Sequence, residues 1–175
     1  ARKKAEAYLE YLGKHDVLTQ LRNRAFYAEE LNRLTRKGPW PLSIIAIDLN
    51  GLKVVNDEQG HAAGDSMLRR VGEVLAKAVD APACAARIGG DEFTVLLPGT
   101  DERGAMALQE RILSMLELNN QFYPGQALSL AMGIACCQSG DAVEAAIHRA
   151  DQAMYAEKNR YHQQKNVDRR QSGSR

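Results

Sequence analysis

The chain alternates between stretches in which apolar residues recur at helical spacing and short runs in which they are continuous. Spacing of three and four residues predicts a helix wherever it persists for several turns. On this basis we expect helices over residues 1–14, 24–35, 67–78, 108–116 and 143–154. Continuous apolar runs bounded by turn residues predict strands over 42–48 and 127–137 and a hairpin over 84–97.

The order of these elements is helix, strand, helix, hairpin, helix, strand, helix. Mixed helices and strands with a hairpin in the middle favour an α+β fold, or mixed α/β sandwich. We expect a central, mostly antiparallel sheet flanked by helices, like a ferredoxin-type palm. The sequence shows no internal repeat and no second core.

Three segments differ in character along the chain. Residues 1–14 look like the end of a longer helix or linker, because the helical pattern starts without a cap. Residues 15–162 hold all the strands and most of the apolar positions, so we expect them to form the single folded domain. Residues 163–175 are polar and are expected to be a flexible C-terminal tail.

Composition narrows the classes of function. The chain has 175 residues, is 45% hydrophobic and carries a net charge of +1, which gives no general attraction to nucleic acid or to an anionic membrane. Neither a signal peptide nor a membrane-length apolar run is visible, so we expect this fragment to be cytoplasmic. The three cysteines are odd in number and lack a C-x-x-C pair, which is typical of reduced packing residues.

The strongest chemical pattern is Gly89-Gly90-Asp91-Glu92-Phe93, which lies within the predicted hairpin. A further acid, Asp48, ends the apolar run over 42–48. Alone, Asp48 could cap a turn, and Gly-Gly-Asp is also an ordinary hairpin turn. If the two strands pair, however, Asp48 and Asp91 converge, and neighbouring carboxylates favour a Mg²⁺ ion shared with phosphate oxygens. This predicts metal-assisted phosphoryl or nucleotidyl transfer.

Other nucleotide and metal motifs are absent. An EF-hand loop beginning at Asp48 would need glycine at its sixth position and glutamate at its twelfth, where this chain has Lys53 and Gln59. The chain contains neither G-x-x-x-x-G-K-[ST] nor G-x-G-x-x-G. P-loop and Rossmann sites are therefore excluded.

Several polar residues after Asp48 suit a nucleotide. Asn56 and Asp65 have the donors and acceptors that would read a guanine edge, although each alone is more often a cap or turn residue. Lys53 could offset the charge of a triphosphate, but lysines are usually solvated. His61 fits either packing or ligand contact.

With these residues assembled, the chain resembles the GGDEF domain of the diguanylate cyclase family over about residues 15 to 160. Five motifs occur in the family's order. They are DVLTQLRNR at 16–24, DLNGLKVVNDEQGHAAGD at 48–65, ARIGGDEF at 86–93, SLAMGIA at 129–135 and ADQAMYAEK at 150–158. The family condenses two GTP molecules into cyclic di-GMP and releases pyrophosphate.

The resemblance implies roles for particular residues. Two Mg²⁺ or Mn²⁺ ions per active site would be held by Asp48, Asp91 and the backbone carbonyl of Leu49. Asp91 would also accept a proton, and Glu92 would support the metal site. The implied substrate residues fall into three groups: Asn56, His61 and Asp65 for the guanosine, Lys53 and Lys158 for the triphosphate, and Leu52, Gly89 and Gly90 lining the site.

The chain departs from the family pattern at several positions. Gln20 replaces a usual glycine, and Asn50 replaces a frequent acid. Tyr161-His162 stand where Gly-Arg often follows the late lysine, so a phosphate-binding arginine is missing unless His162 or Arg160 substitutes. Asp80-Ala81-Pro82-Ala83 replace the R-x-x-D at which product inhibits many members, so that inhibitory site is expected to be absent.

Cyclising two nucleotides requires two sites face to face, so the resemblance implies a homodimer. Residues 1–14 resemble the signalling helix that joins such domains to an upstream sensor, although they could also pack on their own domain. An alternative function is a catalytically silent module of this family that binds GTP or a protein. A palm-like enzyme with another product is a third reading, disfavoured by Asn56 and Asp65.

Overall fold

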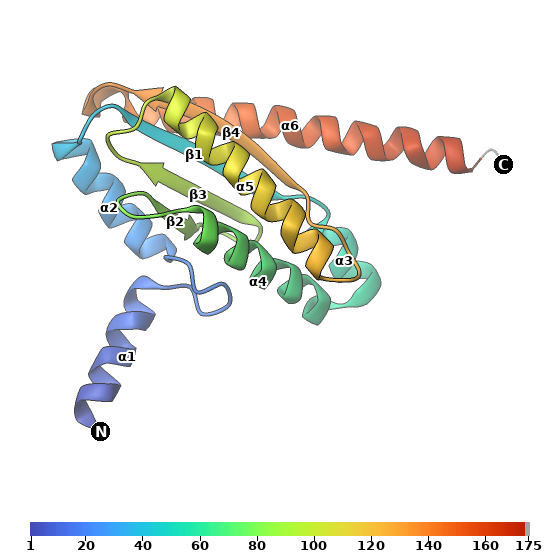
Figure 1. Ribbon diagram of the computed structural model, residues 1–175, viewed down its shortest axis with the longest axis horizontal. Helices are drawn as coiled ribbons and strands as arrows, with labels where there is room; N and C mark the ends of the chain where they lie inside the picture. The colour runs from blue at the N-terminus through green and yellow to red at the C-terminus, as the bar shows by residue number, and fades with distance from the viewer. Residues whose placement is uncertain (174–175) are drawn as a thin grey trace.

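The computed structural model describes residues 1–173 and shows one antiparallel sheet covered by helices on both faces (Figure 1). The four strands are arranged in the order β2-β3-β1-β4. In chain order the elements are α1 (Arg2–Lys14), α2 (Arg24–Lys37), β1 (Leu42–Leu49), α3 (Leu52–Gln59), α4 (His61–Ala78), β2 (Cys84–Arg87), β3 (Glu92–Leu97), α5 (Glu102–Phe122), β4 (Leu130–Cys137), a 3₁₀ turn (Gly140–Ala142) and α6 (Val143–Ser172). The expected α+β fold is confirmed.

Strand β1 lies inside the sheet and is buried at all eight positions. Successive side chains of a strand point to opposite faces, so β1 contributes to two cores. Ile45 and Ile47 belong to a core covered by α3, α4 and α5, whereas Ile44 and Ala46 belong to one covered by α2 and α6. Burial on both faces explains why β1 reads as a continuous apolar run rather than an alternating one.

The strand register sets the position of the acidic residues. In the antiparallel pairing of β1 with β3, Ser43 lies opposite Leu97 at one end and Asp48 lies opposite Glu92 at the other. The turn between β2 and β3, which contains Gly89 and Gly90, is therefore at the same edge of the sheet as the C-terminal end of β1. The predicted convergence of the two acidic segments follows from this register.

The segment over 50–64 is more regular than its polar composition indicates. It forms the short helix α3 and the first turn of α4, which are separated by Gly60 at a φ of 90°. Glycine adopts this positive φ readily, and it lets the chain change direction between two helices. Asp65 consequently lies within α4, whose N-cap is Gly60, so the alternative in which Asp65 is a cap or turn residue is wrong.

The C-terminal segment is helical where the sequence predicts a flexible tail. Helix α6 continues to Ser172, and residues 174–175 lie outside the described residues. Residues 143–172 contain neither glycine nor proline, and the side chain of Gln164 donates to that of Asp168 one turn later at 3.3 Å. Among the described helices, none is long and apolar enough to cross a membrane.

Helix α1 projects from the body of the protein (Figure 1). None of its residues is buried, and Tyr8 and Leu9 are 60% and 67% exposed. Its attachment is at its C-terminal end, where Asn23 donates to the carbonyl of Leu12 and the ring of Tyr11 stacks on His15. The alternative in which this helix packs on its own domain is therefore not what the structure shows.

Gln20 is the one non-glycine residue with a positive φ among the described residues, at 61°. It lies in a tight turn in which its amide donates to the carbonyl of Asp16 and the Asp16 side chain accepts from Thr19. A side chain in the left-handed region brings Cβ close to the following carbonyl oxygen and costs about 1 kcal/mol. Gln20 therefore holds a conformation that glycine would adopt without strain.

We expect Gln20→Gly to raise the free energy of unfolding by about 1 kcal/mol, because it removes this strain at an exposed position. Gln20→Ala is the matched control, since it removes the same polar side chain but keeps Cβ and should give no gain. Urea denaturation of the three proteins measures the difference. Equal gains for glycine and alanine would contradict the assignment of strain to the backbone.

Candidate active site

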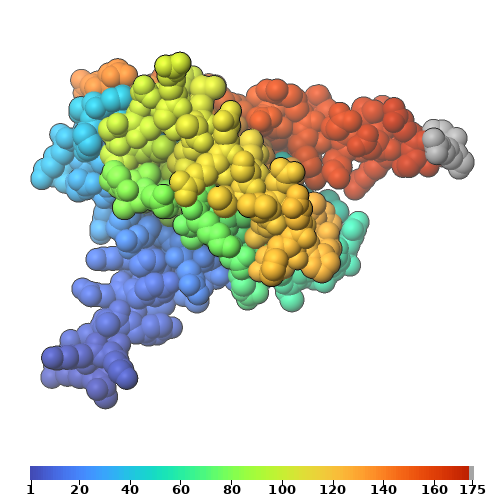
Figure 2. Space-filling model, in the orientation of Figure 1, coloured from blue at the N-terminus to red at the C-terminus, as the bar shows by residue number. Residues whose placement is uncertain are grey.

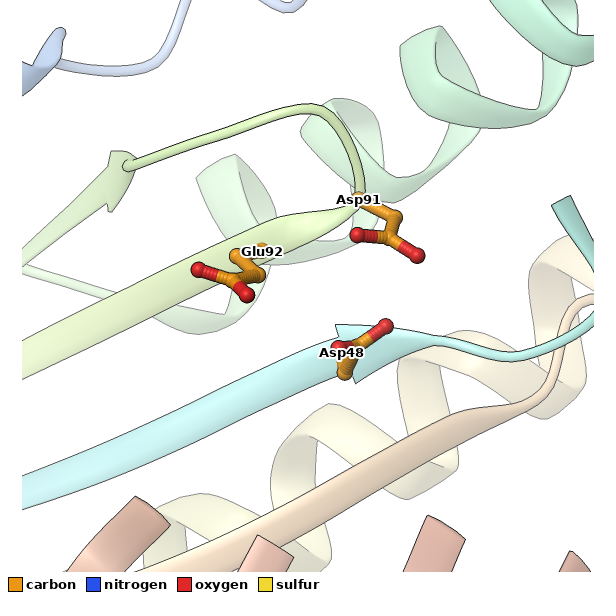
Figure 3. A group of neighbouring side chains, drawn as sticks. All are labelled: Asp48, Asp91 and Glu92. Atoms are coloured by element: carbon orange, nitrogen blue, oxygen red, sulfur yellow. The ribbon is translucent and has the colours of Figure 1, made fainter. Parts of the chain in front are cut away.

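Three carboxylates meet at the edge of the sheet (Figure 3). Asp48, Asp91 and Glu92 each offer an oxygen atom, and these atoms lie within 4.8 Å of one another. Asp91 precedes β3 in the turn and points toward the end of β1, where Asp48 lies. A hydrogen bond of 2.9 Å from the amide of Leu49 to the carbonyl of Asp91 holds the two segments together.

A lysine from α6 is the counter-charge for this cluster. Lys158 in α6 places Nζ 2.9 Å from Oδ1 of Asp48 and 3.7 Å from Oδ2 of Asp91. The side chain of Asp48 is only 4% exposed, whereas that of Asp91 is 36% exposed. The cluster thus combines a buried acid, a more accessible acid and one cation that reaches both.

Burial raises the pKa of Asp48 to about 6, and the charge of Asp91 acts in the same direction, while Lys158 opposes both. The folded pKa is above the unfolded one, so the folded protein holds this proton more tightly. In the absence of metal, stability therefore falls as the pH rises from near 4 through about 6, where the buried carboxylate ionises. A divalent cation would offset this cost because it stabilises the charged form.

The donors present fit Mg²⁺ or Mn²⁺. Both ions prefer oxygen ligands, and Mg²⁺ is usually bound through one or two carboxylates with other positions left for water or phosphate. Asp48 and Asp91 provide such a pair, and Glu92 provides a third carboxylate nearby. The single lysine does not match their combined charge, which favours a further cation at this edge.

A second group of predicted residues lies where α3 packs on α4. Asn56 and Leu52, one turn apart on α3, both contact Gly64 of α4: a Cβ at Gly64 would lie 1.8 Å from Oδ1 of Asn56 and 3.1 Å from Cδ1 of Leu52. Gly64 is therefore required for this approach. Oδ1 of Asn56 is buried and has no hydrogen-bond partner within the described residues. An unpaired buried acceptor is costly, so it is a candidate for contact with a ligand.

His61 and Asp65 lie four residues apart in α4, on the same side of the helix. Asp65 directly follows Gly64, the residue that Asn56 contacts, so the two predicted base-binding residues belong to the same pair of packed helices. Lys53 is exposed on α3, and no ion pair joins it to the carboxylates in the described part of the chain. The shared role of Asn56 and Asp65 in binding a base stays a prediction, and within the described residues the acids pair with Lys158 rather than with Lys53.

The two glycines of the turn have room around them. A Cβ at Gly90 would meet nothing within 4 Å, and a Cβ at Gly89 would meet only Oε2 of Glu92 at 3.7 Å. Neither residue has a positive φ. Packing and backbone geometry therefore do not require glycine at these positions, which supports the expectation that they leave space for a ligand.

Arg87 supports the turn and was assigned no role from the sequence. Its guanidinium donates to the carbonyls of Gly89 at 3.2 Å and Gly90 at 2.9 Å and pairs with Asp16 at 3.3 Å. It thereby ties the turn before Asp91 to the loop that follows α1. An arginine two residues before a Gly-Gly turn was the available signal, but its partner Asp16 is distant in sequence and could not be identified from spacing.

Comparison with known proteins identifies a family. The family model described as "Diguanylate cyclase, GGDEF domain" matches residues 13–164. Diguanylate cyclase A of Treponema denticola is 33% identical over 152 residues, which cover 82% of this chain and 41% of that protein. Diguanylate cyclase DgcP of Pseudomonas aeruginosa is 36% identical over 149 residues, covering 82% of this chain and 22% of that protein.

An uncharacterised signalling protein of Caulobacter vibrioides is 38% identical over 166 residues, which cover 90% of this chain and 20% of that protein. The chain therefore spans less than half the length of these curated relatives.

Among solved structures, the coiled coil and GGDEF domain of DgcB from Caulobacter crescentus, in complex with c-di-GMP, superposes with a TM-score of 0.80. The two sequences are 25% identical, and the match covers 90% of this chain and 86% of that one. A sensory box/GGDEF family protein from Caulobacter crescentus is 35% identical with a TM-score of 0.64, covering 83% of this chain and 98% of that one.

We expect metal affinity to depend on pH through Asp48. A proton and a metal compete for this carboxylate, so the apparent affinity for Mn²⁺ should fall by about tenfold per pH unit below about 6 and level off above it. Titration of Mn²⁺ followed by electron paramagnetic resonance between about pH 5 and pH 8 measures this. Asp48→Asn should bind weakly at every pH. A wild-type affinity that is constant across the range would contradict the prediction.

Proposed function

The chain belongs to the diguanylate cyclase family as a GGDEF domain, and from that premise we propose that it condenses two GTP molecules into cyclic di-GMP. Each ribose 3′-oxygen attacks the α-phosphorus of the other GTP. A P–O bond forms, the bond to pyrophosphate breaks, and two pyrophosphates leave for each product formed.

The observation that carries this proposal is the carboxylate cluster at the sheet edge, with Asp48, Asp91 and Glu92 within 4.8 Å. Asp48 is held almost without exposure on a strand buried on both faces. A buried carboxylate lowers the stability of the fold. Here Asp48 lies beside two further acids, Asp91 and Glu92, and is paired with one cation, Lys158. Such an arrangement is typical of a metal-dependent phosphoryl-transfer site rather than of a structural ion pair.

Two bound Mg²⁺ or Mn²⁺ ions would lower the pKa of the attacking hydroxyl and neutralise charge at the α-phosphate. We propose that Asp48, Asp91 and the carbonyl of Leu49 hold these ions, with Glu92 in support. Asp91 is more accessible than Asp48 and is suited to accept the hydroxyl proton. Lys158, which is at the cluster in the structure, would pair with the triphosphate when metal replaces it, and Lys53 is proposed to contact the same phosphates.

The residues where α3 packs on α4 are suited to bind guanine. The unpaired Oδ1 of Asn56 can accept a hydrogen bond, and Asp65 can accept from N1–H and the exocyclic amine together. His61 lies one turn before Asp65 and would contact the nucleoside. Leu52 forms an apolar wall beside Gly64. Gly89 and Gly90 would give the phosphates access to the turn.

The proposed active unit is a homodimer, because each domain would hold one GTP and the reaction joins two. Helix α1 supports this arrangement, since it exposes Tyr8 and Leu9 on a helix with no buried residue. Pairing of α1 with a second copy would bury these side chains and bring two domains together. In a longer protein the same helix would connect the domain to an upstream sensor.

Inhibition by product through an R-x-x-D site is not expected. Positions 80–83 hold an acid, two alanines and a proline, and Asp80 pairs with Arg111 at 3.4 Å. None of these four side chains offers a cation for the phosphates of cyclic di-GMP. Inhibition by added cyclic di-GMP that disappears when Asp80 is substituted would contradict this proposal.

We expect the chain to convert GTP into cyclic di-GMP with Mg²⁺, and Asp91→Asn to lower the rate by about a hundredfold or more. The substitution keeps the size of the side chain but removes the charge that binds metal and the group that accepts the proton. Separation of the products by mass identifies them, and initial rates give the size of the loss.

Asp141→Asn is the matched control, because Asp141 is exposed in the 3₁₀ turn at the opposite end of the sheet. It should retain the wild-type rate. If the wild type forms no cyclic di-GMP even when dimerisation is enforced by a fused coiled coil, the proposal fails. The chain would then be a silent binding module.

We also expect Leu9→Lys to weaken self-association and to lower the rate per chain at a given concentration, because a charge would be buried in the α1 pair. Glu10→Lys introduces a lysine on the other side of α1 and should have a smaller effect on both self-association and the rate. Sedimentation velocity measures the association. Equal dimerisation of wild type and Leu9→Lys would show that α1 does not form the interface.

A further inference from the structure

A cavity of about 470 Å³ lies between α3 and the C-terminal half of α6. Space-filling shows this half of α6 extending beyond the rest of the protein (Figure 2). The cavity has an apolar part, made by Val54, Val55 and Tyr161, and a polar part, made chiefly by His162, Lys165 and Arg169. Its volume is within the range of 300–1,000 Å³ that is typical of small-molecule sites.

The charges along the cavity favour an anion. Lys165 and Arg169 carry two positive charges, against the single negative charge of Glu58 at the α3 side. Lys158, His162, Lys165 and Arg169 follow one another at spacings of four, three and four residues. They therefore lie on one side of α6, which extends from the carboxylate cluster into the cavity.

The apolar part is placed to accept a flat ring. Val55 is buried, whereas Val54 is 43% exposed at the cavity and has no apolar cover there. The ring of Tyr161 meets that of His162 edge to face at 5.6 Å, and Nζ of Lys165 lies 5.6 Å from its centre. A valine, a tyrosine and a neighbouring cation together provide both an apolar contact and a counter-charge.

The cavity also contacts the loop that follows β1. A Cβ at Gly51 would lie 3.4 Å from the hydroxyl oxygen of Tyr161. The Tyr161 side chain therefore packs against the loop after β1, two residues beyond Leu49. Lys165, Asn166 and Arg169, in contrast, lie beyond residue 164, where the match to the family ends. These three residues of α6 therefore lie outside the part of the chain that the family model matches.

We propose that this cavity binds the oligophosphate of a nucleotide, with Lys165 and Arg169 at the phosphates; where the phosphates belong to a separate nucleotide, Val54 and Tyr161 contact its ring. The phosphates have two possible sources. They belong either to the GTP held at the carboxylates, in which case the proposal rests on the proposed function, or to a separate nucleotide, in which case it does not. The chemistry of recognition is the same for both.

The test is isothermal titration of the full chain with inorganic tripolyphosphate in the presence of EDTA. We expect saturable binding that weakens by about tenfold or more in Lys165→Ala/Arg169→Ala, because two charge-assisted contacts are lost. Lys165→Arg should bind like the wild type. Arg103→Ala removes an exposed arginine of α5 that does not line the cavity and should have no effect.

Competition identifies the source of the phosphates. If GTP displaces tripolyphosphate with Mg²⁺ but not with EDTA, the cavity holds the end of the nucleotide bound at the carboxylates. If GTP displaces it equally well with EDTA, the cavity holds a separate nucleotide. If both bind together, it holds a separate nucleotide, and each of these results supports the site. Asp91→Asn distinguishes this proposal from the enzymatic one, because it should stop turnover and leave tripolyphosphate binding unchanged.

The proposal is overturned if the double variant binds tripolyphosphate as tightly as the wild type. It is also overturned if Arg103→Ala weakens binding to the same extent, since the effect would then reflect net charge alone. Circular dichroism of the double variant verifies that α6 remains helical.

Discussion

A buried carboxylate at the end of a strand covered on both faces is the constraint on which the site depends. Asp48 cannot move away from the core, because every residue of β1 is buried and paired with β3 or β4. The negative charge of Asp48 must therefore be balanced by a positive charge at this buried position. The pairing of Asp48 with Glu92 brings further acids instead of a counter-charge, and among the described residues Lys158 is the cation that pairs with Asp48. The excess of negative charge at this position would be offset further by a bound divalent cation.

The two helical layers contribute different functions to this edge. The layer of α2 and α6 supplies the cation, since Lys158 reaches across to both Asp48 and Asp91. The layer of α3, α4 and α5 supplies the groups suited to a base, with Asn56 held against Gly64. A nucleotide has an anionic end and an aromatic end, and the sheet edge lies between elements matched to each. If GTP binds here as proposed, its phosphates and its base would meet different helical layers.

The sequence predicts the parts of the fold that depend on local patterns. The continuous run of β1 and the acids around the hairpin predicted convergence on the condition that the two strands pair, and the structure supplies that pairing between β1 and β3. Helix α3 was missed because its side chains are mostly polar and only Val55 is buried. The length of α6 was missed because its C-terminal half has no apolar face. In sequence, such a helical segment resembles a polar tail. The contacts of Arg87 with Asp16 depend on tertiary structure and leave no local pattern.

Helix α6 carries residues that belong to the core, to the carboxylate cluster and to the cavity. Residues 143–154 hold it in the core through Val143, Ala146, Ala150 and Met154. Lys158, one turn after Met154, contacts the carboxylates. The following turns of α6 carry Lys165 and Arg169, the cations that line the cavity. Because the helix is continuous and each turn rises by about 5.4 Å, these groups keep fixed separations. Anchoring in the core therefore determines where every cation of α6 lies relative to Asp48, and a phosphate chain would meet them in a set order.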